Sequence, residues 1–349
     1  MRRIMRYLLC GAAMPMLWMI PGGARGADVR ADFLKLIDRP RVPLAAEVTE
    51  LPSAGVLEEF HFSFASDARQ RVPGILIRQR GLAGRAPVVI AMHGTGGRKW
   101  DEAPLLIELA NRGFVAVAID ARYHGERTKA GKGTVEYNEA IVRAWRESGS
   151  GSGEHPFYYD TVWDAMRLID YLDTRDDVDG TRIGLYGVSK GGIETYLTAA
   201  VDERVSVAIP CIGLESFKWA LDNDDWHGRI GTIQHAFDIA AGEAHVASPG
   251  TEFVREFYAR VVPGIDGEFD GPSMVTLIAP RPLMAINGDS DNHTPLPGLK
   301  LCVDAARTAY SAAGAENQFV EKIEANTGHK VNADSEAAAV DWFVKWLKP

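Results

Sequence analysis

Arg182-Ile183-Gly184-Leu185-Tyr186-Gly187-Val188-Ser189-Lys190-Gly191-Gly192 is the stretch that decides the fold of this chain. Its first half is an apolar run typical of a buried strand, and residues 191–200 have the pattern of a helix. A serine in a strained turn between strand and helix needs glycine neighbours, because larger side chains would clash there. The turn exposes the hydroxyl near the helix N-terminus, which stabilises developing negative charge. This context predicts that Ser189 is a nucleophile rather than an ordinary turn serine.

A serine hydroxyl is a poor nucleophile until a base takes its proton. The base is expected on a loop after the final strand, late in the chain. His329, in Thr327-Gly328-His329, follows the apolar stretch 319–323 and precedes the last helix. A lone histidine is usually structural, but the chain order serine, aspartate, histidine singles out His329.

The acid that orients His329 should follow the penultimate strand, where two aspartates compete. Both lie in Asp289-Ser290-Asp291-Asn292-His293-Thr294-Pro295. Asp291 is favoured because it stands four residues before Pro295, whereas Asp289 is expected to cap the turn, a common role of aspartate in loops. The acid would hold the imidazole of His329 and stabilise its charged form.

A glycine-rich loop, His93-Gly94-Thr95-Gly96-Gly97, follows the first buried strand. Backbone N–H groups at this place can bind an oxyanion, and glycine allows the close approach that this requires. We expect the N–H groups of Thr95 and Lys190 to form the oxyanion hole. A phosphate-binding loop is the alternative, but the Lys-Ser/Thr ending of a P-loop is missing.

Strands alternate with helices through most of the chain. The expected strands are 57–64, 72–78, 87–92, 114–119, 182–186, 205–210, 282–286 and 319–323, and the expected helices are 101–112, 158–172, 191–200, 299–312 and 335–347. This order predicts an α/β fold with a mostly parallel central sheet and helices on both faces. Residues 27–56 are expected to form an irregular or helical lead-in.

Two stretches interrupt the alternation. Residues 126–155 are polar and glycine-rich and are expected to form a mobile loop. Residues 215–271 carry Trp219, Trp226, Phe237, Phe253, Phe257 and Tyr258 and are expected to form a helical insertion. Because a long connection leaving the carboxyl end of a strand emerges where ligands bind, we expect 215–271 to be a lid that selects the substrate. The alternative is that all of its aromatic surface packs on the body of the domain.

The first 26 residues read as a signal peptide. Arg2, Arg3 and Arg6 precede an apolar run at 7–20, and Ala24-Arg25-Gly26 fits the small-x-small rule for cleavage before Ala27. The apolar run is short for a membrane span, so an N-terminal anchor is the less favoured reading. The sequence therefore predicts a secreted or periplasmic protein with no stable membrane span after processing.

The remaining residues, 27–349, are expected to form a single domain. Apolar residues make up 46% of the 349-residue chain, which is ample for a substantial core. The net charge of −9 and the lack of a Lys/Arg run argue against a nucleic-acid partner. Cys211 and Cys302 are expected to be small buried apolar residues; an oxidising compartment would allow them to pair, but two cysteines alone do not indicate a disulfide.

Five motifs together resemble the α/β-hydrolase superfamily. They are His93-Gly94-Thr95-Gly96-Gly97, Asp120-Ala121-Arg122-Tyr123-His124-Gly125-Glu126-Arg127, Gly187-Val188-Ser189-Lys190-Gly191-Gly192, Ala279-Pro280-Arg281-Pro282-Leu283 and the stretch 288–295. The branch they resemble most is the dienelactone-hydrolase and acetyl-xylan-esterase-like group, near the prolyl oligopeptidase catalytic domains. The resemblance implies the α/β-hydrolase fold and a Ser-His-Asp triad, and it implies that Asp120 to Gly125 shape the floor of the site.

The residues and the resemblance together predict an esterase that cleaves small carboxylic esters through an acyl-enzyme. Acetyl or other short acyl esters, including sugar esters, are the expected substrates. A peptidase or amidase with the same triad is the first alternative, and fewer than a hundred residues before His93 leave no room for the propeller domain of oligopeptidases. A non-catalytic binding protein is the second alternative, but such proteins usually lose a triad member. No metal or organic cofactor is expected, and the sequence does not predict the oligomeric state.

Overall fold

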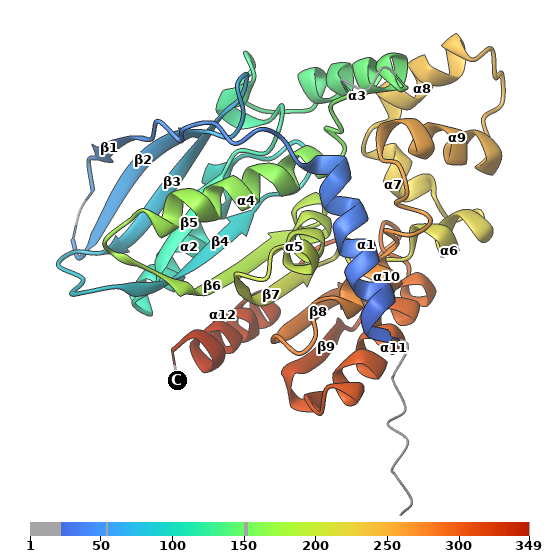
Figure 1. Ribbon diagram of the computed structural model, residues 1–349. Coiled ribbons are helices and arrows are strands. Elements are labelled where there is room, and N and C mark those ends of the chain that lie inside the picture. The colour runs from blue at the N-terminus through green and yellow to red at the C-terminus, as the bar shows by residue number, and fades with distance from the viewer. Residues whose placement is uncertain (1–21, 54, 150–152, 349) are drawn as a thin grey trace, which may run out of the picture.

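The computed structural model describes residues 22–53, 55–149 and 153–348, and it contains a nine-stranded sheet in the order β1-β2-β3-β5-β4-β6-β7-β8-β9 (Figure 1). Three strands at one edge pair antiparallel: β1 (Glu47–Leu51), β2 (Leu57–Ala65) and β3 (Arg71–Gln79). β3 also pairs antiparallel with β5, the first strand of the parallel part.

The remaining six strands run parallel to one another. They are β4 (Ala86–Met92), β5 (Val115–Ile119), β6 (Val178–Val188), β7 (Val205–Cys211), β8 (Leu283–Gly288) and β9 (Phe319–Glu324). Every residue of β4, β5 and β8 is buried, as expected for parallel strands covered on both faces. The carboxyl ends of all six strands meet at one edge of the sheet, where the loops can bring distant side chains together.

Helices cover both faces of this sheet and give the protein two apolar cores (Figure 1). α4 (Tyr159–Asp173) and α5 (Lys190–Val201) pack on one face, together with α1 (Gly22–Ile37). α2 (Ala103–Asn111) and α12 (Ala333–Leu347) pack on the other face. α11 (Leu296–Ala312) also contributes to the first of these cores and contacts β9. The predicted α/β architecture is therefore confirmed.

Helix α1 agrees with the expected irregular or helical lead-in, but strand β1 of the lead-in and a helix in the loop at 126–155 were not predicted. The lead-in holds both α1 and the edge strand β1, whose residues are mostly exposed and lack an apolar alternation. The stretch at 126–155 contains α3 (Val135–Glu147), so its assignment as a mobile loop is wrong for these residues. Tyr137, Ile141 and Trp145 lie four residues apart and are all buried, a helical spacing that the polar, glycine-rich flanks obscured.

The insertion 215–271 is helical, as predicted. It contains α6 (Phe217–Asp222), α7 (His227–Gly231), α8 (Gln234–Glu243), α9 (Thr251–Val261) and the start of α10 (Gly271–Thr276). Its helices lie beyond the carboxyl edge of the sheet, and α8 and α9 pack against α3 (Figure 1). Thus the two interruptions of the alternation form one helical layer.

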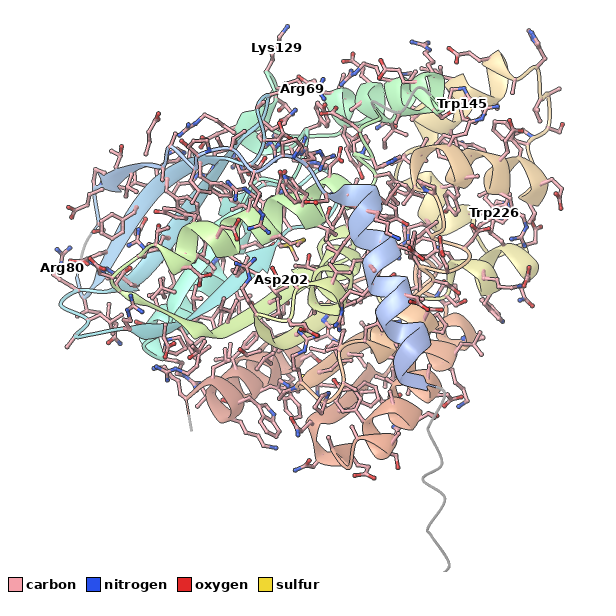
Figure 2. The ribbon with its side chains drawn as sticks, viewed as in Figure 1. Arg69, Arg80, Lys129, Trp145, Asp202 and Trp226 are labelled. Carbon is pink, nitrogen blue, oxygen red and sulfur yellow. The ribbon has the colours of Figure 1, made fainter. Side chains whose placement is uncertain are left out.

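The aromatic side chains of this layer pack on one another. Trp145 of α3 lies 6.0 Å from Phe257 and 5.7 Å from Phe253, measured between ring centroids. Trp226 is only 6% exposed, and its indole N–H donates to Asp224 and Thr251. Figure 2 labels both tryptophans, and both lie in this helical layer. Trp226, one of the aromatic residues of the expected lid, is therefore part of an apolar core.

We expect Trp226→Ala to lower thermal stability and to leave substrate selection unchanged. Truncating a buried tryptophan costs about 3–5 kcal/mol. The measurement is the melting temperature, together with kcat/KM for one small and one bulky ester below the transition. If kcat/KM changed unequally for the two esters at unaltered stability, Trp226 would instead contact the substrate.

Most of the predicted signal peptide, residues 1–21, lies outside the described residues, and α1 spans the expected cleavage position before Ala27. Among the described residues, no helix combines the length and the apolar character that crossing a membrane requires. Cys211 and Cys302 are both buried with free thiols, which confirms their expected burial.

Candidate active site

Ser189 lies in a sharp turn between β6 and α5. Its φ of 57° falls in the left-handed region, which non-glycine residues rarely adopt. The turn leaves no room for side chains: a Cβ at Gly187 would come within 2.1 Å of the Gly191 carbonyl oxygen, and a Cβ at Gly191 within 2.0 Å of the Met92 carbonyl oxygen. The glycines that the sequence placed beside the serine are thus required by backbone packing.

Three side chains from separate loops form a hydrogen-bonded chain. Ser189 Oγ lies 2.7 Å from His329 Nε2, and His329 Nδ1 lies 2.8 Å from Asp291 Oδ2. The ring donates from Nδ1 to the carboxylate, which leaves Nε2 to accept from the serine hydroxyl. Ser189 belongs to the β6–α5 turn, Asp291 to the loop after β8, and His329 to the loop after β9.

The two competing aspartates have different partners. Asp291 Oδ1 accepts from the backbone N–H groups of His293 and Thr294 at 2.8 and 3.1 Å, in addition to its bond with His329. Burial by itself raises the pKa of Asp291, but the hydrogen bond and charge of His329 and these backbone donors outweigh it and leave the pKa lowered. The carboxylate therefore stays ionised beside the imidazole.

Asp289 instead links the loop after β8 to the loop after β9. Its carboxylate accepts from the backbone N–H groups of Asn326 and Thr327 at 2.9 and 3.0 Å. These residues precede His329 in the loop after β9. Asp289 thus caps a turn, as its position in the sequence suggested, and it holds the histidine loop beside the acid loop.

The expected oxyanion residues flank Ser189. Gly94 packs directly against the serine turn, since a Cβ at Gly94 would lie 3.6 Å from Ser189 Cβ, and Thr95 lines the same cavity as Ser189. Lys190 is the first residue of α5, and N–H groups in the first turn of a helix have no acceptor within the helix. The Lys190 side chain points away into the core, where its ammonium group pairs with buried Glu194.

The floor beneath this loop is built from buried polar contacts. His93 Nδ1 lies 2.8 Å from the Gly94 carbonyl oxygen, and its Nε2 accepts from the N–H of Ala121. Burial and the nearby Lys190 charge lower the pKa of His93 to about 4, so the ring is neutral. Asp120 accepts from both the backbone N–H and the ammonium group of Lys99 at 2.7 Å. The 120–127 motif therefore supports the glycine-rich loop at 93–97 through buried hydrogen bonds.

A cavity of about 510 Å³ opens above Ser189. Its lining consists of Gly94, Thr95, Asp101, Glu102, Tyr186, Val188, Ser189, Ile212, Thr232, His293, His329, Lys330, Val331 and Glu336. Among these described residues, Thr232 alone comes from the insertion. Sequence reasoning missed Glu102, Thr232, His293 and Glu336, because nothing local marks a residue that tertiary structure brings to a shared cavity.

The charge of the cavity lining is predominantly negative. Asp101, Glu102 and Glu336 contribute carboxylates, and Lys330 contributes one ammonium group. Burial, together with the charges of Asp101 and Glu336, raises the pKa of Glu102 to about 7. The cavity is thus unfavourable for an additional negative charge.

One group of potential metal ligands occurs among the described residues. It comprises Asp291, His293 and His329, whose ligand atoms lie within 4.8 Å of one another. Both ring nitrogens of His329 are already hydrogen-bonded, to Asp291 and to Ser189. A metal here would displace those bonds, so the group fits proton transfer better than metal binding.

A strained serine turn at the carboxyl edge of such a sheet places this protein among the α/β-hydrolases. The family model of acetyl xylan esterase (AXE1) matches residues 41–225, which is more than half of the chain. The chain therefore belongs to the acetyl xylan esterase (AXE1) family and is a carboxylic ester hydrolase.

Individual relatives agree with this placement. YtaP of Bacillus subtilis (strain 168), described as a hydrolase, is 24% identical over 294 residues, covering 80% of this chain and 85% of its own. A 4-O-methyl-glucuronoyl methylesterase of Sodiomyces alcalophilus is 26% identical over 232 residues, covering 61% of this chain and 45% of its own. The solved structure of acetyl xylan esterase 1 from Thermoanaerobacterium sp. JW/SL YS485 has a TM-score of 0.68 at 19% identity and covers 92% of this chain and 93% of its own. At this low identity, the likeness to the solved structure supports the fold alone.

Proposed function

We propose that this protein hydrolyses short acyl esters of neutral sugars through an acyl-enzyme formed on Ser189. The observation that carries the proposal is the hydrogen-bonded chain from Ser189 through His329 to Asp291, in which Ser189 and His329 line the cavity. His329 takes the proton of the serine hydroxyl as the oxygen attacks the ester carbonyl. Asp291 holds the ring and stabilises the imidazolium that forms.

The carbonyl oxygen becomes negatively charged as the tetrahedral intermediate forms. The backbone N–H groups of Thr95 and Lys190 donate to it. His329 then returns its proton to the leaving alcohol, which departs and leaves the acyl group on Ser189. Water, deprotonated by the same histidine, attacks the acyl-enzyme and releases the acid and free Ser189.

Two observations support sugar esters as the substrate class. The family is named for acetyl xylan, in which a sugar hydroxyl carries a short acyl group, and one relative is named for 4-O-methyl-glucuronoyl methyl esters, in which the sugar supplies the acid. The half-open cavity of about 510 Å³ also offers carboxylates that can accept hydrogen bonds from sugar hydroxyls. An assay with acetylated xylan, methyl glucuronate esters, simple aryl acetates and proline-containing peptides tests the proposal. Cleavage of peptides in preference to all esters would favour the peptidase alternative.

We expect the enzyme to discriminate against substrates that carry a free carboxylate. At an effective dielectric constant near 20, repulsion by the acidic lining costs roughly 1–2 kcal/mol, or about tenfold in kcat/KM. The measurement compares an O-acetylated methyl xyloside with the matching methyl glucuronide acetate. The Glu102→Gln/Glu336→Gln double variant should narrow the difference. Equal kcat/KM for both substrates in the wild type would contradict this expectation.

The insertion can still influence substrate selection through Thr232, its one contribution to the cavity lining among the described residues. We expect Thr232→Phe to lower kcat/KM for bulky esters more than for phenyl acetate, because a larger side chain narrows the cavity without entering a core. Melting temperature should change little. An equal loss of kcat/KM for all the esters would argue against a lid that selects the substrate.

We also propose that residues 1–26 form a signal peptide that is removed on export, with cleavage before Ala27. Basic residues, an apolar run and a small-x-small site support this reading. Mass analysis of the N-terminus of the exported protein tests it. Full-length protein that stays bound to membranes would favour the anchor.

A further inference from the structure

The insertion also contacts the loop that follows β8, beside the cavity. Helix α7 packs against residues 291–295, the loop that carries the proposed triad acid. The contact is between backbones: a Cβ at Gly228 would come within 2.2 Å of the Asn292 carbonyl oxygen and 3.2 Å of His293 Cα. Glycine at this position therefore allows α7 to approach the acid loop as closely as it does.

The next residue of α7 binds the same loop with its side chain. Arg229 Nη2 donates to the His293 carbonyl oxygen at 2.9 Å and to Thr294 Oγ1 at 3.0 Å. Its Nε lies 2.7 Å from the carboxylate of Glu215, at the start of the insertion. Arg229 is 4% exposed and Glu215 is 2% exposed, so this is a buried ion pair. One guanidinium thus joins the insertion to the acid loop.

The two residues that Arg229 contacts, His293 and Thr294, also contact the proposed triad. Their backbone N–H groups donate to Asp291 Oδ1. In addition, the ring of His293 stacks on the ring of His329, with centroids 4.3 Å apart. Thr294 Oγ1 donates onward to the Ile212 carbonyl oxygen, beyond the end of β7. A shift of this loop would therefore move both the carboxylate and the imidazole.

We propose that Arg229 is a positioning residue, which with its counterion Glu215 and the close approach at Gly228 fixes the acid loop from the insertion. The insertion then contributes to the rate of ester cleavage through the geometry of Asp291 and His329, in addition to any part in substrate selection. Glu215 keeps the buried guanidinium neutralised, and the guanidinium supplies two hydrogen bonds in a fixed geometry. This inference rests on the proposed function of Ser189, His329 and Asp291.

The test replaces the pair by apolar residues of similar size, in the variant Glu215→Leu/Arg229→Met. Replacing both members of a buried ion pair often leaves stability unchanged, whereas removing one leaves an unpaired charge. We expect the double variant to keep its melting temperature within a few degrees. Its kcat for phenyl acetate and its rate of labelling by a fluorophosphonate should fall by about 10- to 100-fold, with KM nearly unchanged, because small misplacements of catalytic groups are costly.

Arg255→Met is the matched control. It removes an arginine of the same insertion, one that pairs with Asp222 and Asp266 and not with the acid loop. Its kcat and labelling rate should equal those of the wild type. Arg229→Lys is the second variant, for use if the double variant does not fold: the ammonium keeps the charge but lacks the planar fork. We expect the same pattern with a smaller loss.

A folded double variant or folded Arg229→Lys with wild-type kcat and labelling rate would overturn the proposal. A rise in KM at constant kcat would do the same, since it points to substrate binding instead of positioning. Failure of the proposed function gives a different result: the wild-type enzyme itself would then neither cleave esters nor react with the probe.

Discussion

The Ser189→Ala variant is expected to lose ester turnover by about 10⁵- to 10⁶-fold in kcat while keeping its fold. The loss is large because, among the described residues, Ser189 supplies the hydroxyl that is hydrogen-bonded to His329, and alanine removes it. The fold should survive because alanine has the same Cβ as serine, so the strained φ of 57° acquires no new clash. The hydroxyl also makes its hydrogen bond to His329 and not to the structural core.

Kinetics and covalent labelling check this expectation together. A fluorophosphonate should label the wild type at Ser189 and leave the variant unlabelled, with nearly equal melting temperatures. Ser290→Ala is the matched control, since Ser290 precedes Asp291 in the loop after β8 and its hydroxyl donates to Asp289. Equal labelling of wild type and Ser189→Ala would place the nucleophile elsewhere and end the assignment.

The parts of the structure that the sequence predicted are those with local signals. The serine turn was recognisable because strand, glycines and helix follow one another within the stretch 182–200. The loops that carry Asp291 and His329 were recognisable because each follows an apolar strand, and parallel strands bring such loops to one edge. The distances from His329 to both neighbours, 2.7 and 2.8 Å, agree with the predicted pairing.

The parts that the sequence could not predict depend on contacts between distant segments. Strand β1 is exposed and charged, so its pairing with β2 has no apolar pattern to reveal it. Arg229 and Glu215 read as ordinary charged residues of a helical insertion, and only the folded chain pairs them and places Arg229 beside His293. Glu102 and Glu336 come from the starts of two separate helical segments and meet at one cavity. Trp226, conversely, belongs to the insertion that was expected to be a lid, and its side chain lies in a core.

Residues with local sequence signals and residues placed by long-range contacts have different roles in the proposed site. Local signals specify the groups that carry out the chemistry, because a nucleophile turn or a capped acid loop needs particular residues in sequence. Long-range contacts specify how firmly those groups are held and which substrates reach them. The insertion belongs to the second class, through Arg229 on the acid loop and Thr232 on the cavity.

The choice between the two aspartates remains the sharpest test of the proposed triad. Asp291→Asn is expected to lower kcat by about 10⁴-fold, because an amide facing Nδ1 favours the wrong tautomer of His329 and removes the charge that stabilises the imidazolium. The lowered pKa of Asp291 means that the wild-type group is ionised throughout the neutral range, so the substitution removes a full charge at the working pH.

Asp289→Asn is the matched control, since it lies two residues away in the same loop. Its carboxylate binds the backbone N–H groups of Asn326 and Thr327 and does not contact His329. Asparagine keeps one acceptor oxygen, so we expect a small loss in melting temperature and a kcat close to that of the wild type. Both variants should be compared on phenyl acetate at neutral pH with their melting temperatures recorded. If Asp289→Asn lost more kcat than Asp291→Asn at equal stability, the acid would have to be reassigned to Asp289, and the loop held by Arg229 would lose its place in the mechanism.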